Sequence, residues 1–124
     1  MIEIQGHRGG VLADRHGNTL ASFVEALRLG VDAIEVDVWL TSDGQLALRH
    51  DAVIDDRDIR LEKLREAKVE KHLATTTDVD IETRVPSLSE TLALLRFANA
   101  SGVILDIEVK TEGGQLGTST VLGL

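Results

Sequence analysis

The chain has 124 residues, of which 43% are hydrophobic and 27% are charged, the length and composition of one soluble globular domain. A net charge of −8 and an aromatic content of 2% disfavour nucleic acid and anionic membrane surfaces as partners. The absence of cysteine excludes disulfides, thiolate chemistry and cysteine-bound zinc. No apolar run approaches the roughly 18 residues of a membrane span, and no secretory signal begins the chain. We therefore expect a cytoplasmic protein without a membrane span.

The N-terminal part of the chain predicts a strand followed by a helix. Residues 2–5 form a short apolar run that suits a first strand. Residues 18–29 repeat apolar side chains at helical spacing. Asn18 or Thr19 can cap the start of this helix, and Gly30 suits the position just after its end.

The next segment predicts a β-hairpin. Residues 31–40 are rich in β-branched side chains and predict a strand, and residues 46–50 predict a second short strand. Asp43 and Gly44 lie between them and predict the turn. If these two residues form a two-residue loop, opposed positions sum to 87, so that Asp37 faces His50.

The remainder of the chain continues the alternation of helix and strand, which favours an α/β fold with a mainly parallel sheet. The expected elements are a helix over 59–71, a loop over 75–80, a helix opened by Pro86 and Ser87 and closed near Gly102, a strand over 103–110, and a loop or ragged end over 111–124.

Polar side chains gather at the ends of three of these strands. Glu35 and Asp37 share one face of their strand because side chains repeat every second residue. His7 and Arg8 directly follow the first strand, and the last strand carries Asp106, Glu108 and Lys110 on one face. Ligands of α/β folds bind at the carboxyl ends of strands. Each group alone fits a solvent-facing edge or a surface ion pair, but together their chemistry is complementary.

The three clusters combine hard oxygen ligands, cations and imidazoles. Carboxylates suit a divalent metal, Mg²⁺ or Ca²⁺, while arginine and lysine suit a phosphate. Histidines move protons near neutral pH. His16 and His72 have no evident partner and are interpreted as structural. The candidates for phosphoryl-group chemistry are the carboxylates Glu35, Asp37 and Glu108, the cations Arg8 and Lys110, and the imidazoles His7 and His50.

With these residues the sequence resembles the glycerophosphodiester phosphodiesterase family. Each matching piece alone is weak, but their combination in this order is highly specific. They span roughly residues 6–110 and read "GHRGG", "NTLASFVEALRLGVDAIEVDVWLTSDGQLALRHD", "RVPSLSETLAL" and "ILDIEVK".

The resemblance implies a TIM-type barrel and hydrolysis of a small-molecule glycerophosphodiester to glycerol 3-phosphate and an alcohol. It implies attack by the glycerol hydroxyl of the substrate and opening of a cyclic phosphate by water. By matching position, the divalent metal would bind the three carboxylates, and the two histidines would be the acid/base pair. Arg8 and Lys110 would hold the phosphate.

Two departures from the family pattern modify this expectation. The family usually has glutamate before Asn-Thr, where this chain has Gly17. Its members are about twice as long, so we expect residues 1–124 to be a domain truncated on its C-terminal side, with about half of a barrel. Exposed sheet edges and an exposed apolar interior would then favour a fragment, self-association with a second copy to complete the barrel, or a marginal fold. The alternatives to the diesterase are a member that binds metal or phosphate without turnover and a lysophospholipase D-like phosphodiesterase.

Overall fold

A computed structural model describes residues 3–10, 17–54, 56–67, 84–111 and 114–121, the last of these by their backbone. The elements in chain order are β1 (Gln5–Gly6), the 3-10 turn η1 (His7–Gly9), α1 (Leu20–Leu29), β2 (Ala33–Leu40), β3 (Leu46–Leu48), β4 (Val53–Ile54), β5 (Arg57–Asp58), the 3-10 turn η2 (Leu64–Glu66), α3 (Leu88–Phe97), β6 (Ile104–Thr111) and β7 (Gly114–Val121).

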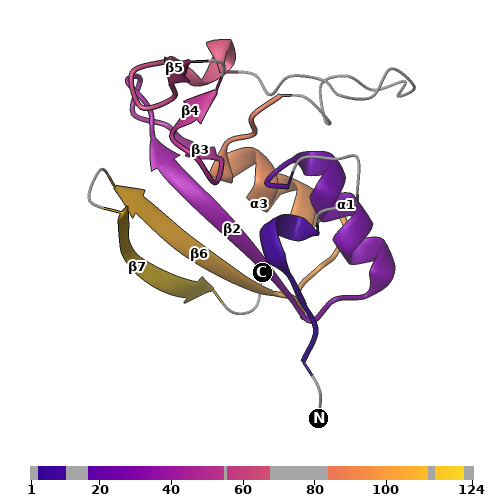
Figure 1. Ribbon diagram of the computed structural model, residues 1–124. Coiled ribbons are helices and arrows are strands. Elements are labelled where there is room, and N and C mark those ends of the chain that lie inside the picture. Colours follow the sequence, from indigo (N-terminus) through magenta and orange to yellow (C-terminus); the bar gives the residue numbers. More distant parts are fainter. Residues whose placement is uncertain (1–2, 11–16, 55, 68–83, 112–113, 122–124) are drawn as a thin grey trace.

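The main sheet has β2 at its centre (Figure 1). β1 and β6 both pair with β2 in parallel, and β7 pairs with β6 in antiparallel orientation. β3 returns antiparallel to β2, while β4 and β5 form a separate hairpin. The parallel strands are linked through helices, so the expected α/β order of strands and helices is confirmed.

Both helices begin with the capping residues that their sequences predict. Thr19 Oγ1 accepts a hydrogen bond from Ser22 N, and the Ser22 hydroxyl accepts one from Thr19 N. Ser87 and Glu90 form the same reciprocal arrangement at the start of α3. Such capping boxes satisfy backbone N–H groups that have no partner within the helix. Gly30 ends α1 in the left-handed conformation, with φ 74°.

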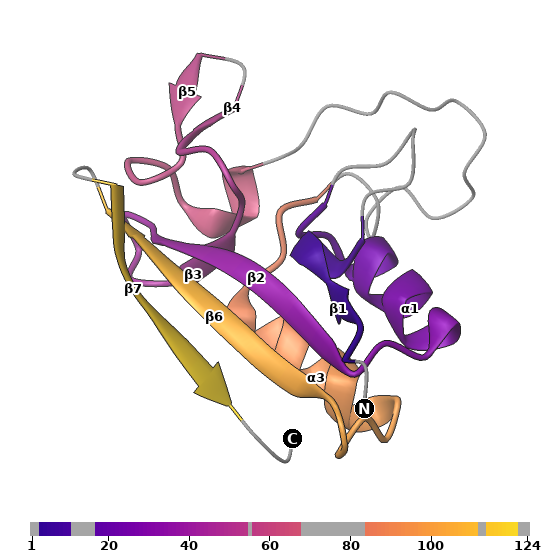
Figure 2. The ribbon, with the colours of Figure 1, turned by 60° about the horizontal axis from the view of Figure 1, so that its bottom comes forward.

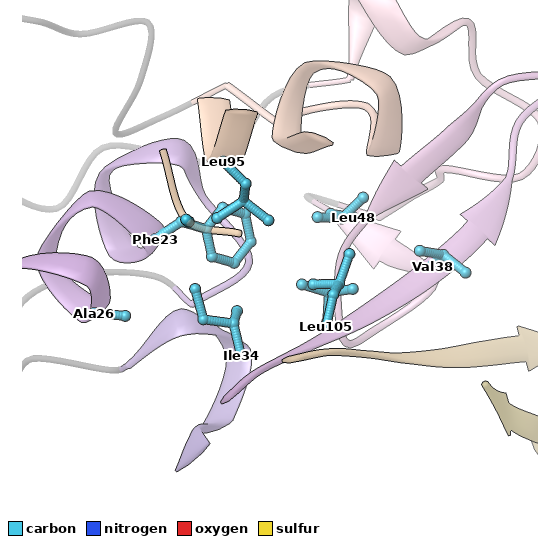
Figure 3. Close-up of a cluster of buried hydrophobic side chains, with 9 residues drawn as sticks. Phe23, Ala26, Ile34, Val38, Leu48, Leu95 and Leu105 are labelled. Atoms are coloured by element: carbon cyan, nitrogen blue, oxygen red, sulfur yellow. The ribbon is translucent and has the colours of Figure 1, made fainter. Parts of the chain in front are cut away.

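The two helices pack on one face of the sheet (Figure 2). Figure 3 shows the resulting core, in which Phe23 of α1 and Leu95 of α3 lie against side chains of β2 and β6. Because side chains alternate along a strand, every second residue of β2 points into this core. These core positions of β2 are Ile34, Val36 and Val38, each at most 1% exposed.

The opposite face of the sheet is mainly polar, which corrects the expectation of an exposed apolar interior. Paired residues of parallel strands point the same way, and Glu35 pairs with Asp106 while Asp37 pairs with Glu108. Gln5 of β1 shares this face and donates a hydrogen bond from Nε2 to Asp106. Carboxylates, an amide and the Lys110 ammonium therefore replace the apolar layer that we expected.

Several sequence predictions differ from the structure. Residues 59–67 contain only the short turn η2 rather than the start of a helix, and 75–80 lie outside the described residues. The helix opened by Ser87 ends at Phe97, before Gly102, and β7 lies where we expected a loop. In the described parts of the chain, no helix has the length and apolarity needed to cross a membrane.

Candidate active site

The backbone after β1 is held in an unusual conformation. Arg8, Gly9 and Gly10 all have positive φ angles, of 54°, 82° and 114°. A Cβ atom on Gly9 would lie 2.5 Å from a ring carbon of Phe23, so the turn approaches α1 as closely as a glycine permits. Non-glycine residues rarely adopt positive φ, and strain of this kind concentrates at functional sites.

This turn is anchored to α1 and points the Arg8 backbone at the sheet. The Arg8 carbonyl accepts hydrogen bonds from Asn18 N at 2.7 Å and from the Ser22 hydroxyl at 3.1 Å. On its other side, Arg8 N donates to Glu35 Oε2 at 3.1 Å. The strained turn thus connects the start of α1 to the first carboxylate of β2.

Three carboxylates converge on the polar face of the sheet. Glu35, Asp37 and Glu108 each offer an oxygen within 4.8 Å of the others. Asp37 and Glu108 are register partners on adjacent strands, and Glu35 precedes Asp37 by two residues on the same face. The side chain of Asp37 is 1% exposed and that of Glu35 is 12% exposed, so this charge is removed from bulk water.

The electrostatics of the cluster affect Glu35 most. Burial raises the pKa of Glu35 above its ordinary value, and the negative charges of Asp37 and Glu108 raise it further. The Arg8 N–H bond and the nearby His7 act in the opposite direction without cancelling these effects. A positive charge placed among the carboxylates would relieve this repulsion.

Two cations already lie beside the carboxylates. Lys110 Nζ is 3.5 Å from Asp37 Oδ1 and also contacts Glu108, and Arg8 Nε is 3.6 Å from Asp37 Oδ2. Partial burial alone would lower the pKa of Lys110, but its bonds to Glu108 and Asp37 outweigh burial and raise it. Lys110 is therefore a fixed positive charge at the edge of the cluster.

The residues present fit a divalent cation. Glu35 Oε1 is buried and has no hydrogen-bond partner among the described residues, and an unsatisfied buried carboxylate oxygen is costly unless something binds it. The donors are all carboxylate oxygens, which Mg²⁺ and Ca²⁺ prefer. The pKa of Glu35 is raised by burial first and by the charges of Asp37 and Glu108 second, and a bound cation would oppose both effects.

The hairpin places His50 differently from our expectation. Thr41 N donates to Gln45 O, so three residues, 42–44, form the loop between this closing pair, and Gly44 has φ 76°. Paired positions therefore sum to 86 rather than 87. The prediction that Asp37 faces His50 is wrong: Arg49 N donates to Asp37 O at 3.0 Å instead.

His7 nevertheless lies beside the cluster, and β3 leads the chain toward His50 along the same edge of β2. β6 occupies the other edge, so β1 and β3 share this one. β1 ends opposite Ile34, and β3 runs back to a point opposite Val38. The residues that follow each strand are therefore near the part of β2 that holds Glu35 and Asp37. His7 Nε2 lies 3.6 Å from Glu35 Oε2, and its side chain is 71% exposed.

The His50 side chain pairs with its neighbour in sequence. His50 Nδ1 lies 2.8 Å from Asp51 Oδ1, with 41% of the histidine side chain exposed. A carboxylate bonded to one ring nitrogen orients the imidazole and leaves Nε2 to exchange protons. The His50 carbonyl also accepts a hydrogen bond from Trp39 Nε1 at 3.2 Å.

Sequence reasoning missed two residues that hold this site. Asn18, considered only as a helix cap, donates from Nδ2 to Asp37 Oδ2 at 2.9 Å and accepts from Asp37 N at 3.1 Å. Trp39 supports the chain at His50, and Arg60 lies over its ring at 5.6 Å. No local sequence signal points to this role of Asn18, because Asp37 lies 19 positions away in the chain.

Parallel strands with helices on one face, and a cluster of carboxylates and cations on the opposite face, define a protein of the α/β-barrel class with a binding site for charged ligands. Comparison with known proteins makes this specific. Residues 7–117 match the glycerophosphoryl diester phosphodiesterase family, and the chain belongs to that family.

Similar proteins carry the corresponding names. The chain is 32% identical over 102 residues to a glycerophosphodiester phosphodiesterase of Caldanaerobacter subterraneus subsp. tengcongensis, covering 76% of this chain and 40% of that protein. It is 31% identical over 118 residues to one of Bacillus altitudinis, covering 89% and 46%. A phosphodiesterase from Oleispira antarctica, solved with the product sn-glycerol-3-phosphate, is similar with a TM-score of 0.67 and 25% identity, covering 91% and 47%.

The chain spans less than half the length of the curated relatives it matches. Its α/β architecture corresponds to about half of the TIM-type barrels among its structural neighbours. The expected fold class, an incomplete barrel of this type, is thereby confirmed.

Proposed function

We propose that this chain carries the metal- and phosphate-binding half of a glycerophosphodiester phosphodiesterase. The substrate would be a small-molecule glycerophosphodiester and the products glycerol 3-phosphate and an alcohol. The observation that carries the proposal is the convergence of Glu35, Asp37 and Glu108 within 4.8 Å, beside the cations Arg8 and Lys110. Family membership and a relative solved with sn-glycerol-3-phosphate support the substrate class.

The carboxylates would hold a divalent cation, Mg²⁺ or Ca²⁺, which when bound supplies positive charge to the phosphate oxygens. Arg8 and Lys110 would hold the same phosphate from the side and oppose the negative charge that builds on it during transfer. Lys110 suits this role because its raised pKa keeps it protonated.

His7 and His50 would move the protons. Overall, water adds across the bond between phosphorus and the alcohol oxygen, so one histidine takes a proton from the attacking hydroxyl and the other donates one to the leaving oxygen. The Asp51 carboxylate, 2.8 Å from His50 Nδ1, orients that ring. His7 Nε2 lies 3.6 Å from Glu35 Oε2.

A direct assay tests this proposal. Purified chain is incubated with glycerophosphocholine and either Mg²⁺, Ca²⁺ or EDTA, and glycerol 3-phosphate is measured enzymatically. We expect metal-dependent release that His7→Ala and His50→Ala both abolish, while Lys63→Ala, at an exposed site, leaves it unchanged. Release no greater than that of His50→Ala in every metal would contradict the proposal for this chain.

A member that binds metal or phosphate without turnover is the second candidate. Gly17, where the family usually has glutamate, and the span of less than half of the relatives favour it. Calorimetry with Mg²⁺ and with inorganic phosphate separates the two, because binding without product release identifies this candidate. Replacing glycerophosphocholine by lysophosphatidylcholine in the same assay tests the lysophospholipase D-like reading.

Self-association to complete the barrel and a cytoplasmic location stay predictions. The polar face opposite the helices carries Glu35, Asp106 and Glu108, so a second copy would have to place compensating charges or a metal against them. Sedimentation velocity with and without divalent metal measures this directly, and a metal-dependent dimer would support closure of the sheet by two chains.

A further inference from the structure

The side chain of Asn18 makes a closed pair of hydrogen bonds with Asp37. Its Nδ2 donates to Asp37 Oδ2 at 2.9 Å, and its Oδ1 accepts from Asp37 N at 3.1 Å. Asn18 is 2% exposed and Asp37 is 1% exposed. Both bonds are thus protected from competition with water.

The orientation of this amide is unambiguous. Exchanging its nitrogen and oxygen would place a carbonyl against the Asp37 carboxylate and an NH₂ group against the Asp37 N–H, which are two repulsive contacts. The two hydrogen bonds of the Asn18 amide hold Asp37 at its backbone N–H and at its carboxylate. The torsions between these atoms are therefore fixed, and with them the direction of the second carboxylate oxygen.

The backbone of Asn18 is equally constrained. Its φ of 59° lies in the left-handed region, which asparagine adopts more readily than most residues. Its N–H donates to the Arg8 carbonyl at 2.7 Å. The residue therefore joins the start of α1, the Arg8 turn and Asp37 on β2 at one buried point.

We infer that Asn18 is a positioning residue, which aims the Asp37 carboxylate into the cluster formed with Glu35 and Glu108. This inference rests on the proposed function, because its consequence is the affinity of the carboxylate cluster for a divalent metal. If the Asn18 amide is removed, the Asp37 carboxylate keeps its charge but is no longer held in one orientation. Removing such partners of metal ligands typically weakens metal binding by roughly 10- to 100-fold.

The chain offers a matched pair of variants for the test. Asn18→Gly removes the amide and keeps the positive φ accessible, since glycine adopts it freely. Asn99→Gly makes the same change at an exposed residue whose φ is 54°. Circular dichroism and thermal unfolding first establish that both variants are folded at the temperature of the binding experiment.

Isothermal titration calorimetry with Mg²⁺ and with Ca²⁺ then measures the dissociation constants. We expect Asn18→Gly to bind roughly 10- to 100-fold more weakly than the wild type, and Asn99→Gly to bind equally. A loss of stability alone does not produce this result, because the folded fraction of both variants is nearly complete at that temperature. Equal affinity of the wild type and Asn18→Gly would overturn the inference and leave the proposed function standing.

A second measurement needs no metal. Hydrogens of the Asn18 side-chain amide, assigned in NMR spectra by their loss in Asn18→Gly, should exchange with water more slowly than those of exposed Asn99. Rapid exchange of both amides would overturn the inference by showing that the contact with Asp37 is absent. If the wild type binds neither metal, the proposed metal site fails and the positioning role fails with it, whatever the exchange rate.

Discussion

Lys110 Nζ lies 3.5 Å from Asp37 Oδ1, and the Asp37 side chain is 1% exposed. The lysine reaches Asp37 from the neighbouring strand β6, where Glu108 also contacts it. A buried carboxylate is thereby neutralised from within the sheet rather than by solvent. The same ammonium is the cation that we expect to meet the substrate phosphate, so its two roles can be separated by substitution.

Replacing Lys110 by methionine should affect metal and phosphate in opposite ways. Three carboxylates then lose one of their cations, so we expect the metal-free protein to lose about 2 kcal/mol of unfolding free energy. Mg²⁺ should bind at least as tightly as to the wild type, because a competing charge is gone, whereas inorganic phosphate should bind more weakly. Urea unfolding measures the unfolding free energy, and calorimetry measures the affinities for Mg²⁺ and for phosphate, with Lys63→Met at an exposed site as control. A parallel loss of metal and phosphate affinity would contradict separate roles.

A second prediction concerns the close approach of the Arg8 turn to α1. Gly9→Ala introduces a Cβ atom 2.5 Å from Phe23 at a φ of 82°, so it combines backbone strain with overpacking. Gly30→Ala meets no atom within 4 Å at a similar φ of 74° and adds the strain alone. We expect losses of about 2–4 kcal/mol for Gly9→Ala and about 1 kcal/mol for Gly30→Ala. Equal losses in urea unfolding would show that the turn is not closely packed.

The parts of the fold that local chemistry determines could be predicted from the sequence. Thr19 and Ser87 mark the starts of the two helices, because each forms a capping box with the residue three positions later. The alternation of apolar residues along β2 identifies the face that Phe23 covers. The carboxylates Glu35 and Asp37 could be placed on one side for the same reason. These features depend on residues close together in the sequence, so they can be predicted without knowing the rest of the structure.

The errors arose where distant contacts decide the structure. One extra loop residue, closed by Thr41 and Gln45, moved the hairpin register by one position. Residues 59–67 have good helix formers, but Ile59 and Ala67 are both buried beside Trp39, and this packing overrides helical propensity. The bonds between Asn18 and Asp37 join residues 19 positions apart, so no local pattern could have revealed them.

A third prediction uses the capping box of α3 to test the pH dependence of stability. Partial burial alone would raise the pKa of Glu90, but bonds from Arg84 and Ser87 N outweigh burial and lower it from its ordinary value of 4.5. A lowered folded-state pKa stabilises the protein above pH 4.5, and this contribution is lost as the pH falls below that value.

Glu90→Gln keeps a side-chain oxygen that can accept the hydrogen bond from Ser87 N, but removes the charge. We expect it to lower the unfolding free energy at pH 7 by about 0.5 kcal/mol, a value typical of a part-exposed ion pair. The difference from the wild type should shrink as the pH falls below 4.5. Urea unfolding at several pH values measures it, with Glu3→Gln at an exposed position as control. A difference that grows as the pH falls would contradict the assignment.

The last prediction returns a carboxylate to position 17, where the family usually has glutamate and this chain has Gly17. Because Asn18 is bonded to Asp37, a glutamate directly before it would lie close to the cluster and to the cations that we propose bind phosphate. We expect Gly17→Glu to raise kcat/KM for glycerophosphocholine about tenfold, equivalent to about 1.4 kcal/mol of transition-state stabilisation. Gly102→Glu adds the same charge at an exposed turn with no atom within 4 Å of its Cβ and should leave kcat/KM unchanged. A rise in both variants would indicate a general charge effect, and no rise in either would show that the glutamate is dispensable in this chain.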